Sequence, residues 1–241
     1  MHIRIAAALR PSVTMSLVLA IMLAGSPGAA VAQVTVFVPT DGDIKATLAL
    51  PGDAQRGKDV YAECQTCHRT DASGRATFSI PRLSGQHASV LIKQLMDIRS
   101  GLRVNPDMRD YMLDSELTLQ DFADMAAYLQ SLPVAGKIGQ GPPELVPRGQ
   151  ALFASDCAGC HGEHGEGRAE LFYPMLASQH YKYLLLELDL ILSGGRGNSN
   201  PAMPPILKNY SADDKRAVAA YLAQLPAPPA TPPPSQTSAA P

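Results

Sequence analysis

The sequence has no tryptophan, only four cysteines, and aromatic residues at just 5% of its 241 positions. Its formal net charge is −2, so it lacks the excess of Lys and Arg that is typical of proteins that bind nucleic acids. Four cysteines are too few for a fold held together by disulfides. No segment shows the alternation of a β-strand except the short stretch Val34–Val38, which we expect to be an extended arm. The lack of strand patterns favours a helical protein.

Long apolar runs are also missing, except near the N-terminus. There, the apolar stretch Met15–Gly25 follows Arg4 and Arg10 and precedes a small-x-small motif at residues 30–32. This order is typical of a secretory signal peptide, so we predict that residues 1–32 are cleaved and that the protein is exported. An uncleaved membrane anchor is the alternative, but the run is shorter than the roughly 20 apolar residues that span a bilayer.

The rest of the sequence is an internal repeat with a shift of 93 residues. The shift superposes Cys64, Cys67 and His68 on Cys157, Cys160 and His161, Gln86-His87 on Gln179-His180, and Arg103 on Arg196. We therefore predict two tandem domains. The expected boundaries are an N-terminal extension at 33–50, a first domain at 51–135, a linker at 136–147, a second domain at 148–226 and a disordered Pro-rich tail at 227–241.

Three helices are expected in each repeat. The first leads into the cysteines, at 57–63 and 149–156, and the central one ends at Gly101 in the first repeat and at Gly194 in the second. The last helix begins with a capping-box pattern, Thr118-x-x-Asp121 or Ser211-x-x-Asp214. Gly57 and Gly149 in the first helix predict a close crossing with the last helix, where each glycine would meet a tyrosine ring, Tyr128 or Tyr221.

The motif C-x-x-C-H occurs once in each repeat, at Cys64–His68 and at Cys157–His161. It is typical of c-type haem attachment, in which Cys64, Cys67, Cys157 and Cys160 would bind two haems covalently and His68 and His161 would be the proximal iron ligands. A C-x-x-C redox pair needs no histidine and normally accompanies strands. A zinc site would have to be built separately in each repeat. Two motifs at equivalent positions behind a signal peptide favour haem.

A covalent haem also explains how such small domains can fold, because it supplies the large apolar centre that a domain with few aromatics lacks. The predicted fold class is therefore all-α: two tandem domains, each of three to four helices around one haem. Pro81 and Pro174 follow the proximal histidines at equal distance, and we expect their carbonyl oxygens to orient the imidazole rings.

The sixth iron ligand is expected to be a methionine in each domain. Met203 stands among prolines and is predicted to lie on a ligand loop, with Met175 as its rival. In the first domain the repeat favours Met108, because a slip of two residues in its register aligns Asn105-Pro106-x-Met108 with Asn200-Pro201-x-Met203; Met112 is the alternative. Ligation by the repeated residues His87 and His180 is a third possibility, although a surface or helix-capping role is more common for histidines at the start of a helix.

In these motifs the chain resembles the tandem dihaem class I cytochromes c of the cytochrome c4-like family. The resemblance covers residues 51–226 and includes the paired Asn-Pro-x-Met and Ala-Ala-Tyr segments. It implies two His/Met-ligated haems whose propionate edges face each other, and periplasmic electron transfer with redox proteins such as a dehydrogenase, a cytochrome complex or a terminal oxidase. The alternative is an enzyme, either a dihaem peroxidase or a thiosulfate-oxidising enzyme. The latter would need a cysteine ligand, and the two motifs use all four cysteines.

Overall fold

The computed structural model describes residues 40–114, 116–134 and 139–228. Within these ranges the chain is helical, and its only extended pairings are isolated bridges at Arg75–Ile80 and Arg168–Tyr173. The all-α prediction is therefore confirmed. The predicted signal peptide, the stretch Val34–Val38 and most of the Pro-rich tail lie outside the described residues.

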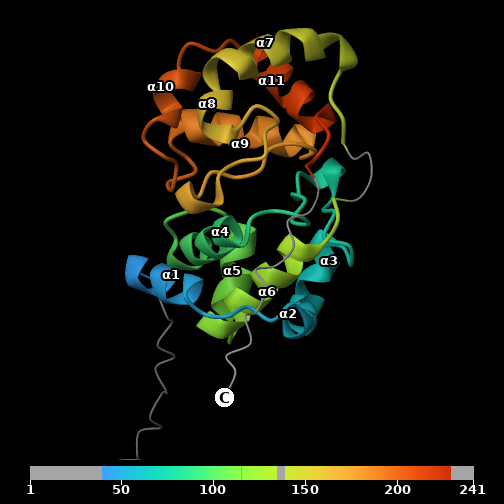
Figure 1. Cartoon of the computed structure of the whole chain (residues 1–241). Helices are drawn as coiled ribbons and strands as arrows, with labels where there is room; N and C mark the ends of the chain where they lie inside the picture. Colours follow the sequence, from blue (N-terminus) through green and yellow to red (C-terminus); the bar gives the residue numbers. More distant parts are fainter. Residues whose placement is uncertain (1–39, 115, 135–138, 229–241) are drawn as a thin grey trace, which may run out of the picture. The chain divides into compact units, whose positions relative to one another are not determined.

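The two repeats form two groups of helices with the same order (Figure 1). The first contains α2 (Ala54–Val60), α3 (Gln65–His68), α4 (Ala88–Ser100), α5 (Pro106–Asp114) and α6 (Leu119–Ser131). The second contains α7 (Val146–Asp156), α8 (Ala158–His161), α9 (Tyr181–Ser193), α10 (Met203–Leu207) and α11 (Ala212–Gln224). Short 3-10 turns precede or follow the cysteine motifs at η1 (Tyr61–Cys64), η2 (Ala76–Phe78), η3 (Pro143–Leu145) and η4 (Ala169–Leu171). No helix among the described residues has the length and apolarity that crossing a membrane requires.

The helix ends follow the signals in the sequence. Thr118 caps α6 and Ser211 caps α11, each in a reciprocal capping box with the aspartate three residues later. Gly101 and Gly194 end α4 and α9 in the left-handed region, with φ of 82° and 76°. These predicted boundaries are confirmed.

The first and last helices of each domain cross closely at a glycine, as predicted. A Cβ atom on Gly57 would overlap the backbone carbonyl of Asp124, and one on Gly149 would overlap that of Ala217. The expected tyrosine is absent at Gly57, whose nearest atoms belong to Asp124 and Met125, whereas a Cβ atom on Gly149 would also lie 2.8 Å from the Cβ atom of Tyr221. The ring of Tyr128 packs against that of Tyr61, with centroids 5.7 Å apart, and the ring of Tyr221 packs against that of Phe153, with centroids 5.6 Å apart. The backbones approach too closely for a ring to fit between them.

The substitution Gly149→Ala is expected to destabilise the second domain by about 3 kcal/mol or more, because the new methyl group must push two backbones apart. Gly159→Ala is the matched control, since its Cβ would meet nothing within 4 Å. Thermal unfolding followed by circular dichroism should show a lower Tm for Gly149→Ala alone. Equal Tm values for the two variants would contradict the close crossing.

The N-terminal extension contains a helix that the sequence analysis did not predict. α1 (Asp41–Leu48) begins at a capping box of Thr40 and Asp43 and packs on α4 and α6. It buries Ile44 and Thr47 in the first domain. A helix of eight residues is marginal alone, so it depends on this tertiary packing as well as on the capping box at Thr40.

Candidate functional site

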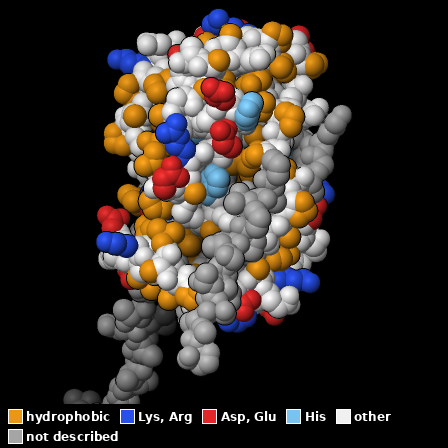
Figure 2. Space-filling view, in the orientation of Figure 1, with side chains coloured by type: hydrophobic (Ala, Val, Ile, Leu, Met, Phe, Trp, Pro, Cys, Tyr) orange, Lys and Arg blue, Asp and Glu red, His pale blue; other side chains and the backbone are white. Residues whose placement is uncertain are grey.

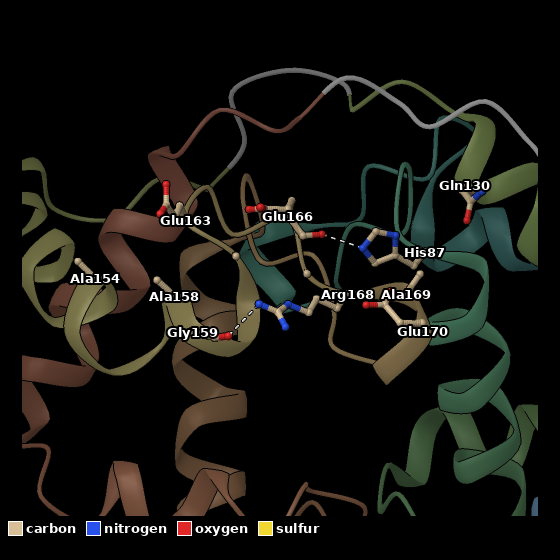
Figure 3. Close-up of a pocket in the computed structure, with 12 residues that line it drawn as sticks. His87, Gln130, Ala154, Ala158, Gly159, Glu163, Glu166, Arg168, Ala169 and Glu170 are labelled. Carbon is tan, nitrogen blue, oxygen red and sulfur yellow. Dashed lines mark hydrogen bonds between the residues drawn. The ribbon is translucent and has the colours of Figure 1, made fainter.

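Both C-x-x-C-H motifs are short helical turns held in the same way. Cys64 and Cys157 are half-buried, Cys67 and Cys160 are exposed, and none of the four forms a disulfide. The guanidinium group of Arg75 donates to the carbonyl oxygen of Thr66 at 2.9 Å. In the second domain Arg168 donates to the carbonyl of Gly159 at 3.1 Å (Figure 3). These equivalent arginines were missed in the sequence analysis, although the repeated Gly-Arg pairs Gly74-Arg75 and Gly167-Arg168 marked them.

The two motif histidines are buried and oriented by the predicted proline carbonyls. His68 Nδ1 lies 3.0 Å from the carbonyl oxygen of Pro81, and His161 Nδ1 lies 3.3 Å from that of Pro174. A carbonyl can only accept a hydrogen bond, so Nδ1 must carry the proton and donate. Each Nε2 therefore keeps its lone pair, which is the donor that iron needs. The prediction for Pro81 and Pro174 is confirmed.

The protonation states of these groups suit haem better than the alternatives. Burial lowers the pKa of His68 and that of His161, and this effect outweighs the hydrogen bonds to the proline carbonyls, which raise the pKa. Both imidazoles are therefore neutral at neutral pH. Burial also raises the pKa of Cys64 to about 11 and that of Cys157 to about 11. A redox-active or zinc-binding cysteine would need a stabilised thiolate instead.

A cavity of about 540 Å³, lined mainly by the second domain and in part by the first, brings together the four residues predicted to hold the second haem: Cys157, Cys160, His161 and Met203. Its other lining residues are largely apolar, among them Leu184, Val218 and Leu222. The cavity thus offers two thiols, a neutral imidazole, a thioether and apolar walls, and these residues fit a c-type haem. A separate groove of about 890 Å³ is open and is lined by residues such as His87, Glu163 and Glu166 (Figure 3).

The prediction that Met203 lies on a loop was wrong. Met203 is the first residue of the short helix α10, and Met108 lies in the first turn of α5. Pro106 opens α5, and Pro204 and Pro205 follow Met203, because proline is compatible with the first turn of a helix. In the first domain Met108 is half-buried and Met112 is fully buried. Met108 and Cys64 both pack against the core cluster that contains Met112.

His87 and His180 link the two domains, so the expectation of a surface or capping role was wrong. Both precede a helix, α4 or α9, but neither side chain caps it. His87 Nε2 donates to the carbonyl oxygen of Glu166 at 2.7 Å (Figure 3), and His180 Nε2 donates to that of Ser73 at 2.8 Å. Nε2 of each ring is thereby occupied, which disfavours these histidines as iron ligands.

The adjacent glutamines form the second part of this pseudo-two-fold interface. Gln86 makes two hydrogen bonds with the backbone of Met175, of 2.9 and 3.0 Å. Gln179 makes the equivalent pair, also 2.9 and 3.0 Å, with the backbone of Arg82. Arg82 and Met175 occupy equivalent positions in the repeat. The repeated Gln-His pair is therefore one of the elements that join the domains, a role that its recurrence in the sequence signalled but did not explain.

The family model for cytochrome c matches the chain twice, at residues 54–133 and 146–226. The chain belongs to the cytochrome c family. Cytochrome c4 from Pseudomonas aeruginosa is 34% identical over 184 residues, which cover 72% of this chain and 89% of that protein. The thiosulfate dehydrogenase electron acceptor of Stutzerimonas stutzeri is 32% identical over 210 residues, covering 79% of this chain and 96% of that protein.

A solved structure has the same fold. Reduced recombinant cytochrome c4 from Pseudomonas stutzeri matches with a TM-score of 0.65 and 31% sequence identity, covering 72% of this chain and 99% of that one. This cytochrome c thus has two domains of the cytochrome c4 type, and its two C-x-x-C-H motifs hold two covalent haem c groups. It is an electron-transfer protein: the bound haems supply the one-electron couple, and the chain's residues hold, orient and bury them.

Proposed function

We propose that this cytochrome is a periplasmic electron carrier in which His68 and Met108 ligate the first haem iron, and His161 and Met203 the second. The observation that carries the proposal is the cavity in which Met203 and His161 line the same space as the thiols Cys157 and Cys160. The first domain repeats the oriented histidine, and the repeat assigns Met108 to the position equivalent to Met203.

Two protein ligands on each iron leave no coordination position for a substrate. Such a site exchanges electrons but does not perform bond chemistry, whereas a dihaem peroxidase needs one open or displaceable position. The oriented His68 and His161, together with a methionine in each domain, therefore favour a carrier over a peroxidase.

The ferrous protein is expected not to bind carbon monoxide appreciably at neutral pH, because both axial positions would be taken by histidine and methionine. The measurement is the visible spectrum of the dithionite-reduced protein before and after addition of the gas. Turnover of hydrogen peroxide should likewise be negligible. Rapid stoichiometric binding of carbon monoxide at one haem would refute closed sites and favour the peroxidase alternative.

The proposed partners are redox proteins, with a dehydrogenase as electron donor and a cytochrome complex or terminal oxidase as acceptor. A relative whose name is thiosulfate dehydrogenase electron acceptor supports a donor of the dehydrogenase class. Figure 2 shows acidic, basic and hydrophobic side chains interspersed on the face in view. Such a mixed surface suits brief encounters rather than steering by one strong charge.

The proposed periplasmic location depends on cleavage of residues 1–32. The pattern of Arg4, Arg10 and the apolar stretch Met15–Gly25 supports export. N-terminal sequencing of the protein from the periplasmic fraction should begin at Gln33. A first residue upstream of the apolar stretch would support a membrane anchor instead.

A further inference from the structure

A ring of polar side chains, of which Arg103 and Glu187 are buried and two others half-buried, lies where the two domains meet, between residues of α4 and α9 and the loops that follow them. Its members are Gln94, Arg103, Glu187 and Arg196. Arg103 donates to Gln94 of its own domain at 3.0 Å and to Glu187 of the other domain at 2.7 Å. Arg196 makes the converse contacts, to Glu187 of its own domain and to Gln94 across the interface, the latter at 3.0 Å.

The ring follows the internal repeat but breaks its symmetry at one position. Arg103 and Arg196 are equivalent, and so are Gln94 and Glu187. Gln94 presents a neutral amide oxygen to both arginines, whereas Glu187 presents a carboxylate to the same two groups. The ring therefore contains two shared positive charges and a single negative charge, and that negative charge belongs to the second domain.

Glu187 is ionised despite its burial. Burial alone would raise its pKa, but Arg103 and Arg196 together more than offset this effect and hold the pKa below its usual range. The hydroxyl of Tyr183 completes the surroundings through its contact with Arg103 at 2.9 Å. The carboxylate is thus a fixed charge that stays negative at neutral pH.

The ring forms part of the wall of the second domain's haem cavity. All four of its members line the same cavity as Cys157, Cys160, His161 and Met203. A fixed negative charge beside a haem stabilises the ferric form, which carries one more positive charge, and so lowers the reduction potential. The positive charges of Arg103 and Arg196 act in the opposite direction. These residues are equivalent in the two domains, so the difference between the domains is the carboxylate of Glu187.

We propose that the negative charge of Glu187 lowers the reduction potential of the second haem relative to that of the first. The difference between Gln94 and Glu187 then biases the distribution of a single electron toward the first haem. The other charged groups that line the cavity are Arg82, Lys93 and Asp156, and Asp97 is paired to Lys93. The inference requires the two haems, but neither the axial methionines nor the partners proposed above.

The test is a redox titration of the holoprotein in which NMR signals of the haem methyl groups report each potential separately. Glu187→Gln keeps the shape and one acceptor oxygen but removes the charge, so it should raise the potential of the second haem more than that of the first. The expected change in the distribution of one electron between the haems is about tenfold, or 59 mV for a one-electron couple.

Two further variants separate charge from packing. Glu187→Asp retains the charge and should keep the potentials close to those of the parent protein. The double variant Gln94→Glu with Glu187→Gln moves the carboxylate to the first domain and should shift the difference between the two potentials in the opposite direction. Unchanged potentials in Glu187→Gln, or equal effects of Glu187→Gln and Glu187→Asp, would overturn the proposal. The redox titration tests only the effect of Glu187, whereas carbon monoxide binding tests the closed iron sites, so the two proposals can fail separately.

Discussion

A chain in which Cys157 and Cys160 are both alanine is expected to carry one haem instead of two. Without thioether bonds the second haem is not retained, and its cavity of about 540 Å³ is left unfilled. Truncation of a single core side chain already costs about 2–5 kcal/mol, and this void is far larger than one side chain. We therefore expect the second domain to lose its fold, while the first keeps its haem.

Intact mass spectrometry after acid-acetone extraction measures this result directly, since covalent haem stays on the polypeptide. The reciprocal variant, with Cys64 and Cys67 changed to alanine, should lose the other haem. Circular dichroism should show partial loss of helix in both. A parent protein that folds without haem in a host competent for cytochrome c maturation would contradict this expectation.

The second large effect is expected at the axial methionines. Methionine sulfur favours ferrous iron, so loss of the true ligand should lower one haem's potential and open its iron to small ligands. Met203→Ala should do so in the second domain and Met108→Ala in the first. The far-red charge-transfer band of methionine-ligated ferric haem should fall by about half in each variant, because one of the two haems loses its sulfur ligand.

Met112→Ala is the matched comparison for the first domain. Met112 is fully buried in the core cluster, so its truncation should cost about 2–5 kcal/mol of stability and leave the charge-transfer band intact. If instead Met112→Ala halves the band and Met108→Ala does not, the ligand lies one helical turn further along α5. The two measurements, unfolding and band intensity, distinguish the roles.

Much of the fold could be predicted because its signals are local and occur twice. Capping boxes at Thr118 and Ser211 need only neighbouring residues, and so do the glycine ends of α4 and α9. The contact of His68 with Pro81 depends on a short loop of fixed length. The repeat then allowed each local observation to be checked against a second copy.

The features that escaped prediction depend on packing between distant segments. α1 is helical because Ile44 and Thr47 are buried against α4 and α6. His180 is buried, and its ring donates a hydrogen bond to the backbone carbonyl of Ser73, which is far away in the sequence. The difference between Gln94 and Glu187 was readable in the alignment of the repeats, but only the fold shows that both face the same arginines. Sequence patterns cannot specify such partners when the contact joins two domains.

The reciprocal contacts of the Gln-His pairs have the geometry of an isologous interface, in which the same patch serves on both sides. In an ordinary homodimer every residue of that patch is present twice, and a substitution changes both sides together. Here one polypeptide contains both halves, so each keeps the other at a high effective concentration while the two can differ. A carboxylate at position 187 opposite an amide at position 94 is a combination that identical subunits could not form.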